Sequence, residues 1–425
     1  MSKKYKIFLA GAGTGGHVLT ALSVYKALLK KDPSLKDKIL FVGSINLRKG
    51  MEDKPSLEEK LCKEQGVNFA KIRTGKVQRF LTWRTIRLLL QIPLGFWDAF
   101  WLVVKNRPKV VFASGGYVTP PVLFWAKVFG AKTFLHEQTM APGLASRVSA
   151  YFADKILISF KQSIRHFKPK LQKKVIYTGY PVQRDIFDVN TFDDLLKLLK
   201  DTGEIKNDTQ DYLKELENLE NAQKLYNKPV LFVTGGSTGA HVINEVIYKN
   251  LPDLLEHFVV FVQTGDSTLY NDFDKFVQYK QNLQDKGANE NKLLIVQKFL
   301  AKEMGYVLKK ADFVIARSGA GTVYQLGMLG KRSILIPLPK ARNNEQYKNA
   351  LLLKNLGIAK IIKQDKWLEI DNLAQLLLKE LENLSSAIKA NAVRKNNTYK
   401  TKQFTGLFPL NADEKIASLI LKALK

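Results

Sequence analysis

A short apolar run that ends in glycines is the feature that most constrains the fold of this chain. Residues 7–10 are Ile-Phe-Leu-Ala, as expected of a strand that is buried on both faces. Four of residues 11–16 are glycine, and apolar residues then recur at helical spacing from Val18 to Leu29. A helix that begins at the carboxyl end of a parallel strand presents free backbone N–H groups, so this segment predicts a phosphate-binding turn.

The same order of strand, glycine turn and helix recurs at residues 230–247, where Val230–Thr234 is followed by Gly-Gly-Ser-Thr-Gly-Ala. Short apolar runs alternate with amphipathic segments elsewhere, which is typical of a parallel sheet covered by helices. The expected further strands are residues 39–44, 110–114, 133–138, 258–263, 293–296, 312–316 and 333–337. A chain of 425 residues is long enough for two domains. We therefore predict an α/β fold with two doubly wound, Rossmann-like domains facing a cleft.

The expected boundaries follow from this pattern. Residues 1–180 form the first domain, and residues 229–410 form the second. Residues 181–228 are a linker with an inserted, charged and weakly patterned segment at 190–227. The C-terminal segment 411–425 has an N-cap followed by apolar residues on one face, and this helix is expected to pack back on the first domain.

The first glycine turn matches G-x-G-x-x-G, but this pattern alone is weak evidence for a dinucleotide site. A nicotinamide-binding unit needs an acidic residue at the end of its second strand, and residues 39–44 contain none. His17 lies in the first turn of the helix, where the helix dipole disfavours the imidazolium form. Two interpretations of His17 remain open at this point, a helix-capping residue and a functional one.

The charge of the chain indicates a polyanionic partner. It has 67 basic and 39 acidic residues, a net charge of +28, which suits either nucleic acid or an anionic membrane surface, although a general abundance of lysine explains part of it. No RNA-binding signature is visible, so nucleic acid is not the expected partner. The expected membrane contacts, where basic residues alternate with apolar ones, are Lys76, Arg79, Phe80, Trp83, Ile86 and Arg87. Residues 94–104 are instead expected to form a core helix. The most hydrophobic stretch, residues 88–104, is not expected to span a membrane, because it is interrupted by Gln91, Pro93 and Asp98.

Cysteine and histidine usage excludes two further classes of protein. The lone cysteine, Cys62, excludes a disulfide framework and is expected to be a non-reactive packing residue. No signal peptide is apparent before the first strand, so a reducing cytosol is the expected compartment. The five histidines are scattered, and no carboxylate pair lies beside a glycine turn, so neither a metal nor another cofactor is expected.

Six motifs occur in a recognisable order. They are Gly-Thr-Gly-Gly-His at 13–17, Gly-Gly-Tyr at 115–117, His-Glu-Gln at 136–138, Gly-Gly-Ser-Thr-Gly-Ala at 235–240, Arg-Ser-Gly-Ala at 317–320 with Thr322, and Glu-Gln-Tyr-Lys-Asn-Ala at 345–350. In this order they resemble the MurG family, the N-acetylglucosaminyltransferases of peptidoglycan synthesis. The resemblance spans nearly the whole chain apart from the segment at 190–227.

The resemblance implies a GT-B glycosyltransferase architecture and an inverting reaction. N-Acetylglucosamine would pass from UDP-N-acetylglucosamine to the muramyl 4-hydroxyl of undecaprenyl-diphosphate-linked muramyl-pentapeptide, which converts lipid I to lipid II. It implies no cofactor, an N-terminal domain that binds the acceptor and the membrane, and a C-terminal domain that binds the nucleotide sugar. The enzyme would work as a peripheral protein on the cytoplasmic face of the bacterial inner membrane.

The resemblance also assigns residues by motif. His17 is the expected general base and Glu137 the second candidate. The expected donor-binding residues are Thr14, Gly15, Gly16, Thr139, Gln183, Arg184, Ser237, Leu300, Ala320, Gly321, Thr322, Val323, Tyr324, Gln325 and Gln346. The expected seat of the acceptor diphosphate is Gly13, Gly115, Gly116 and Tyr117, and Arg317 is expected to be structural.

Four departures from the family pattern concern the donor. Thr139 stands where the family usually has Asn. In the family's Gly-Asn-Pro-Val-Arg pattern, Tyr180 replaces Asn and Gln183 replaces Arg, with Arg184 one place later. Gln325 replaces the acidic residue that serves the ribose hydroxyls, and a neutral acceptor bonds about half as strongly as a charged one. The alternatives are therefore a related transferase that acts on another membrane lipid, such as diacylglycerol, and a catalytically inactive, membrane-associated paralogue.

Overall fold

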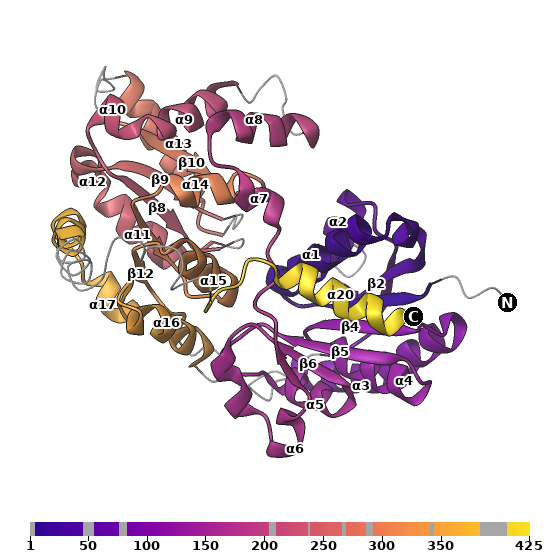
Figure 1. Cartoon of the computed structure of the whole chain (residues 1–425). Coiled ribbons are helices and arrows are strands. Elements are labelled where there is room, and N and C mark those ends of the chain that lie inside the picture. Colours follow the sequence, from indigo (N-terminus) through magenta and orange to yellow (C-terminus); the bar gives the residue numbers. More distant parts are fainter. Residues whose placement is uncertain are drawn as a thin grey trace. The chain divides into compact units, whose positions relative to one another are not determined.

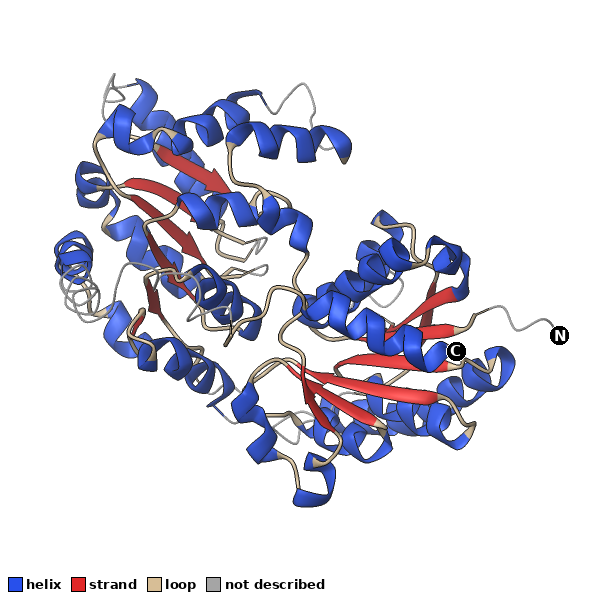
Figure 2. Ribbon diagram, viewed as in Figure 1, coloured by secondary structure: helices blue, strands red, loops and turns tan. Residues whose placement is uncertain are grey.

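The computed structural model describes residues 5–45, 55–75, 83–203, 210–236, 239–265, 269–285, 292–339, 344–382 and 406–425, without the side chains of 83–90 and 223–224. The chain divides into two compact units. Unit 1 comprises residues 1–182 and 409–425, and unit 2 comprises residues 183–408. Each unit is a parallel sheet with helices packed on it (Figures 1 and 2).

The described part of unit 1 contains a seven-stranded parallel sheet in the order β3-β2-β1-β4-β5-β6-β7. The strands are β1 (Ile7–Gly11), β2 (Ile39–Ser44), β3 (Phe69–Ile72), β4 (Val110–Gly115), β5 (Lys132–Glu137), β6 (Lys155–Ile158) and β7 (Val175–Tyr177). The helices are α1 (Gly15–Lys31), α2 (Leu57–Glu64), α3 (Trp83–Asn106), α4 (Thr119–Val128), α5 (Leu144–Phe152), α6 (Pro169–Gln172) and α20 (Ala412–Leu424), with 3₁₀ helices at Pro33–Lys38 and Lys161–His166. The strand order reverses between β1 and β4, and open α/β sheets bind their ligands at such a switch point.

The alternation of side chains along β1 explains why helices cover both faces of this sheet. Ile7 and Leu9 are buried in one hydrophobic cluster, whereas Phe8 and Ala10 are buried in another on the opposite face. The last helix, α20, adds Ile416, Ala417 and Ile420 to the cluster of Ile7, and it lies beside α1 (Figure 1). Burial of each large aliphatic side chain of this kind contributes about 1.5–3 kcal/mol.

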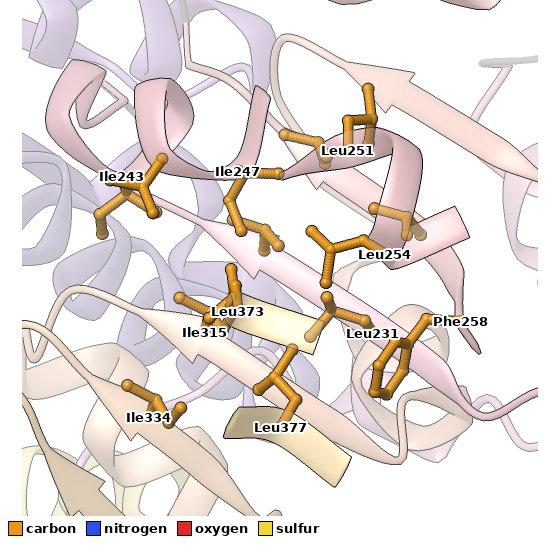
Figure 3. Close-up of a cluster of buried hydrophobic side chains, with 14 of the residues drawn as sticks. Leu231, Ile243, Ile247, Leu251, Leu254, Phe258, Ile315, Ile334, Leu373 and Leu377 are labelled. Carbon is orange, nitrogen blue, oxygen red and sulfur yellow. The ribbon is translucent and has the colours of Figure 1, made fainter. Parts of the chain in front are cut away.

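The described part of unit 2 contains a six-stranded parallel sheet in the order β10-β9-β8-β11-β12-β13. The strands are β8 (Val230–Thr234), β9 (Val259–Gln263), β10 (Leu294–Gln297), β11 (Phe313–Ala316), β12 (Ser333–Leu335) and β13 (Ala359–Ile361). The helices are α7 (Arg184–Asp188), α8 (Phe192–Asp201), α9 (Gln210–Glu220), α10 (Ala222–Tyr226), α11 (His241–Lys249), α12 (Leu251–His257), α13 (Asp272–Asp285), α14 (Met304–Lys310), α15 (Ala320–Leu329), α16 (Glu345–Asn355) and α17 (Gln364–Leu368), and residues 373–382 are also helical. Figure 3 shows Ile243, Ile247 and Leu254 packed over Leu231 and Ile315 in the core of this unit.

The segment that the sequence left without a function, residues 190–227, contributes α8, α9 and α10 to unit 2. Helix α14 anchors it. The hydroxyl of Tyr306 donates to the carbonyl oxygen of Leu216 at 2.9 Å, and the ammonium group of Lys310 pairs with Glu220 at 2.6 Å. These contacts attach the segment to α14, one of the helices of unit 2.

Helix α3 differs from its prediction as a core helix over residues 94–104. Ala99 and Val103 are fully buried, as predicted, but the side chains of Trp97 and Trp101 are 57% and 53% exposed, and Leu94 is 41% exposed. The prediction was wrong for this face, because nothing in the described part of unit 1 covers the side of α3 that points away from the sheet. Within the described residues, no helix has the length and apolar character that crossing a bilayer requires.

Candidate functional site

The turn between β1 and α1 has the geometry of an anion-binding helix start. The hydroxyl of Thr14 caps α1 by accepting from the N–H of His17 at 3.4 Å. Gly15 and Gly16 are the first two residues of the helix, whose N–H groups have no acceptor within it. The first turn contains no acidic side chain that would neutralise the helix dipole. The N–H of Gly13, in contrast, already donates to the carboxylate of Glu58 at 2.9 Å.

The turn between β4 and α4 packs directly on the turn between β1 and α1. A Cβ atom on Gly116 would lie 2.0 Å from the carbonyl oxygen of Ala12, and a Cβ atom on Gly115 would lie 2.6 Å from the His17 ring. Both glycines have positive φ angles, +119° at Gly115 and +90° at Gly116, which other residues rarely adopt. Glycine is therefore required here because the two turns and the histidine ring touch.

His17 is held as a neutral imidazole. Its Nδ1 atom lies 2.9 Å from the carbonyl oxygen of Ser114, which can only accept, so Nδ1 carries the proton and Nε2 keeps its lone pair. Burial is the larger influence and lowers the pKa of His17 to about 4, whereas the hydrogen bond to Ser114 acts in the opposite direction. The side chain is half-buried by accessible surface, so solvent still reaches part of it. At neutral pH the ring is an available proton acceptor.

The polar end of β5 lies at the same edge of the sheet. His136 is buried, its Nε2 atom lies 3.1 Å from the carbonyl oxygen of Gly179, and burial lowers its pKa to about 4. The Glu137 side chain is only 3% exposed, and burial raises its pKa. Its Oε1 atom accepts from the backbone N–H of Thr139 at 2.8 Å, with the Thr139 hydroxyl at 2.7 Å. Glu137 and Thr139 thus hold each other in a closed turn.

The remaining unit 1 candidates lie between β2 and β4. The Tyr117 ring packs against Gly13, where a Cβ atom would lie 3.0 Å from the ring, and the Tyr117 hydroxyl lies 2.9 Å from that of Ser44. Burial raises the pKa of Tyr117 to about 12, so the phenol stays protonated. Helix α4 begins Thr119-Pro120-Pro121, and its two prolines have no N–H to offer an anion.

In unit 2 the turn between β8 and α11 repeats the glycine arrangement. A Cβ atom on Gly239, whose φ angle is +75°, would lie 2.2 Å from the carbonyl oxygen of Thr264, so the turn lies directly on the loop that follows β9. The N–H of Gly236 donates to the Thr234 hydroxyl at 3.0 Å. The predicted donor residue Ser237 lies outside the described residues.

Helix α15 contains six of the predicted donor residues. Ala320, Gly321, Thr322 and Gln325 are half-buried, whereas the side chains of Val323 and Tyr324 are fully buried in the core, where Tyr324 packs edge-on against Phe408. Only the backbone of Val323 and Tyr324 is therefore placed to meet a ligand. The Ser318 side chain, just before this helix, is fully buried.

The other donor candidates are spread over unit 2. The Leu300 side chain is 2% exposed, and the Gln346 side chain on α16 accepts from the N–H of Leu338 at 2.9 Å. Gln183 and Arg184 are half-buried at the start of α7. The guanidinium group of Arg317 donates to the carbonyl oxygen of Ile336 at 3.1 Å and to the Gln364 amide at 2.7 Å, which ties β11 to its neighbours. Among the predicted membrane contacts, Lys76, Arg79 and Phe80 lie outside the described residues, and so do the side chains of Trp83, Ile86 and Arg87 on α3.

Both halves of the chain match one enzyme family. Residues 7–158 match the glycosyltransferase family 28 N-terminal domain, and residues 230–405 match the glycosyltransferase family 28 C-terminal domain. The chain belongs to glycosyltransferase family 28. It is therefore a glycosyltransferase, and the predicted resemblance is confirmed.

Relatives in this family match the chain over nearly its full length. The chain is 30% identical over 404 residues to the UDP-N-acetylglucosamine--N-acetylmuramyl-(pentapeptide) pyrophosphoryl-undecaprenol N-acetylglucosamine transferase of Borreliella burgdorferi, which covers 94% of this chain and 95% of that protein. It is also 30% identical over 415 residues to the protein of the same name from a Thermoanaerobacter species, covering 98% and 99% of the two chains. The crystal structure of Acinetobacter baumannii MurG has a TM-score of 0.62 at 22% identity, with 98% of this chain and 99% of that chain covered. This likeness confirms the predicted GT-B fold.

Some polar contacts around the candidate site were not found from the sequence. Glu58 reaches Gly13 from a helix 45 positions later in the chain, and Gln138 reaches both Gly16 and Ser114. In unit 2 the carboxylate of Asp272 lies 2.9 Å from Nδ1 of His241 and accepts from the Asn244 amide at 2.8 Å. The motif His-Glu-Gln included Gln138 but gave it no role. No sequence signal identified Glu58 or Asp272, because their partners are distant in the chain.

Proposed function

We propose that this chain transfers N-acetylglucosamine from UDP-N-acetylglucosamine to the muramyl 4-hydroxyl of a muramyl-pentapeptide linked through diphosphate to undecaprenol. The names of the full-length relatives state the donor, the lipid-linked acceptor and the group transferred, and the six motifs of the resemblance are present in order. Such a reaction needs a base for the acceptor hydroxyl and hydrogen-bond donors that stabilise the departing diphosphate.

The observation that carries the proposal is the neutral His17 with a free Nε2 lone pair at the first turn of α1. The acceptor oxygen would attack the anomeric carbon of the donor from the face opposite the diphosphate. The new C–O bond forms as the bond between the anomeric carbon and the diphosphate oxygen breaks, and that electron pair leaves with UDP. The hydroxyl proton passes to Nε2 of His17, which makes His17 the general base.

The geometry favours His17 over Glu137 as the base. A general base must come within hydrogen-bond reach of the proton that it takes. The Glu137 carboxyl is buried and already accepts from Thr139, so its role would be to hold the turn that ends β5. The half-buried His17 ring has one nitrogen committed and one free.

For the donor, we assign the diphosphate and ribose to the start of α15 and to the turn after β8. Ala320, Gly321 and Thr322 begin α15, whose unpaired N–H groups and dipole would stabilise the charge that develops on the leaving diphosphate. Gln325 would accept from one ribose hydroxyl. The proposed roles of Ser237, Leu300 and Gln346 at the diphosphate, uracil and sugar, and those of Thr14, Gly15, Gly16, Thr139, Gln183 and Arg184, rest on their motifs alone.

For the acceptor diphosphate, Gly115 and Gly116 remain the proposed seat with Gly13 and Tyr117 beside them. Because the Gly13 N–H is occupied by Glu58 and the Tyr117 hydroxyl lies against Ser44, these two residues would shape the seat rather than donate to the anion. The anion would instead find donors at the N-terminus of α1.

We further propose that the exposed face of α3 docks on an anionic membrane. Its Trp97 and Trp101 rings touch at 5.8 Å between centroids, and further ring contacts continue this aromatic cluster through Phe100 to Trp125. The guanidinium group of Arg107 lies 4.2 Å from the centre of the neighbouring Phe129 ring, and the chain as a whole is strongly basic. Exposed aromatic rings beside cations suit an interface with acidic headgroups. The enzyme would then be a peripheral protein on the cytoplasmic face of the bacterial inner membrane.

The proposed function is tested by a transfer assay with UDP-N-acetylglucosamine and the undecaprenyl-linked muramyl-pentapeptide. A diacylglycerol acceptor and UDP-glucose run in parallel, and the folded state is checked by protection from thermal unfolding by UDP. Product from the first pair only is the expected result. Product with diacylglycerol would mean another lipid acceptor, and folded, UDP-binding protein with no product from any pair would indicate an inactive paralogue.

A further inference from the structure

The carbonyl oxygen of Ser114 receives two side-chain donors at once. Nδ1 of His17 lies 2.9 Å from it, and Nε2 of Gln138 lies 3.0 Å from it. A carbonyl oxygen has two lone pairs, so these two hydrogen bonds fill its capacity. Ser114 is fully buried, and its own hydroxyl lies 2.7 Å from the carbonyl oxygen of His17 and 3.2 Å from that of Ala10. The position of this carbonyl is therefore fixed by the protein around it.

The Gln138 amide is itself held in one orientation. Its Nε2 atom also lies 3.3 Å from the carbonyl oxygen of Gly16, so two carbonyl oxygens converge on this nitrogen and identify it as the NH₂ end. Its Oε1 atom lies on the other side, 3.4 Å from where a Cβ atom of Gly16 would stand. The side chain is 5% exposed, so water does not compete freely for these bonds.

Gln138 makes no direct hydrogen bond to His17, but these contacts connect the two residues indirectly. It ties the residue before His17 to the carbonyl that receives the His17 proton. Gln138 therefore holds the carbonyl whose hydrogen bond to Nδ1 sets the His17 tautomer, since the tautomer of a histidine follows from the hydrogen bond made by one of its nitrogens. Glu137 and His136, its neighbours on β5, do not share this carbonyl.

We propose that Gln138 is a positioning residue that fixes His17 in the Nδ1–H tautomer and so keeps Nε2 free as the base. The inference deepens the proposed function and rests on it where the catalytic rate is concerned. Without the Gln138 amide, the Ser114 carbonyl loses one of its two anchors and can turn away from His17. The Nε2–H tautomer then gains population, and in that form the nitrogen that faces the acceptor has no lone pair.

The direct test is nitrogen NMR of protein labelled with ¹⁵N-histidine, in the folded full chain without substrate. The chain has five histidines, and the His17 signals are identified by their loss in His17→Gln. In the wild type we expect His17 as Nδ1–H, and in Gln138→Leu we expect a mixture of both tautomers. Wild-type His17 in the Nε2–H form overturns the proposal, and so does an unchanged tautomer in the variant.

Kinetics supply the second readout. Gln138→Leu should lower kcat by about 10-fold or more while the KM for the donor stays within about twofold, because misplacing the base affects the chemical step rather than donor binding. The matched control is Gln172→Leu, since the Gln172 amide also donates to a backbone carbonyl of unit 1, that of Phe167 at 2.9 Å, far from His17 in the chain. The control should keep both kcat and the His17 tautomer. If Gln138→Leu does not fold, Gln138→Met retains the length and bulk of the side chain without the donor.

The outcomes separate this inference from the proposed base. If His17→Gln retains full kcat while Gln138→Leu still mixes the His17 tautomers, the base assignment fails and the positioning inference holds. If His17→Gln abolishes transfer while Gln138→Leu changes neither tautomer nor kcat, the base holds and the positioning inference fails. A loss of kcat in Gln138→Leu with an unchanged tautomer also contradicts the inference, because the loss would then have another cause.

Discussion

The contact between Gly115 and the His17 ring makes a sharp prediction for Gly115→Ala. The new Cβ atom would lie 2.6 Å from Nδ1 and Cε1 of His17, whereas an ordinary carbon contact needs about 3.5 Å or more, so the ring must move by about 1 Å. That movement breaks the 2.9 Å hydrogen bond from Nδ1 to Ser114. A displacement of about 1 Å at a reacting group costs on the order of 100-fold in rate, and we expect kcat to fall by that factor.

The matched control is Gly130→Ala. Gly130 also has a positive φ angle, +81°, but its Cβ atom would meet nothing within 4 Å. Both variants carry the backbone strain of a non-glycine residue at positive φ, about 1–3 kcal/mol, so both should unfold at lower temperature. Gly115→Ala carries a further overpacking cost of about 1–3 kcal/mol.

The assay compares kcat at saturating acceptor, the affinity for UDP and the thermal midpoint of the two variants. We expect only Gly115→Ala to lose kcat, with unchanged UDP affinity, because the diphosphate, ribose and uracil of the donor are assigned to unit 2. Equal kcat in the two variants would refute the argument that Gly115 exists to admit the His17 ring. A lower UDP affinity in Gly115→Ala alone would mean that Gly115 belongs to the donor site instead.

Three further predictions follow from other parts of the molecule. Because the pKa of His17 is lowered to about 4 in the free chain, kcat/KM should stay level from pH 7 to about pH 5 and fall only near pH 4. A profile of kcat/KM that falls already near pH 6.5 would contradict this expectation. The same lowering of pKa, shared by His136, makes folding stability decline as pH drops from about 6.5 to 4, since the unfolded chain binds these protons first. Gln325→Glu should tighten UDP binding about fivefold by calorimetry, since a charged acceptor bonds a hydroxyl more strongly, and should not tighten binding of 2′,3′-dideoxy-UDP. Trp97→Ser combined with Trp101→Ser should release the protein from vesicles that contain anionic lipid without changing UDP affinity, because both rings are exposed. The same double change at the buried pair Phe232 and Phe261 would instead unfold unit 2. If the Trp97 and Trp101 variant stays bound to the vesicles, α3 is not the membrane contact.

Most interior strands of both sheets were predicted, and so was the edge strand β10, whereas the interior strand β6 and the edge strands β3, β7 and β13 were not. Strands such as β1, β4, β8 and β11 are buried throughout, so their sequences are continuous apolar runs that end in a glycine turn. Strands β3, β7 and β13 each form an edge of a sheet, are three or four residues long and are only partly buried. Little of their surface faces a core, so their sequences lack the apolar run that marks a strand.

Helix α3 illustrates a different limit of sequence patterns. Trp97 and Trp101 are spaced as a helix face, and an apolar face normally indicates contact with a core. The core contacts come instead from the small residue Ala99 and from Val103, because α3 lies close to its neighbours on that side. A pattern identifies the apolar face of a helix but not what covers it, and here the covering partner is proposed to be lipid.

The glycine turns show why site residues were only partly predictable. Glycine next to a strand end was interpreted as a place for a ligand to approach the backbone, and the first turns of α1 and α15 keep that interpretation. At Gly115 and Gly116, however, the space that a Cβ atom would need is taken by the protein itself, by the His17 ring and the Ala12 carbonyl. Close approach of a ligand and close packing of the protein itself both require glycine, so the sequence alone cannot distinguish them. The structure distinguishes them, because it shows one turn packed on the other. In this chain the turn that contains Gly115 and Gly116 packs around the His17 ring, so a substitution there displaces the proposed base before it affects the binding of any anion.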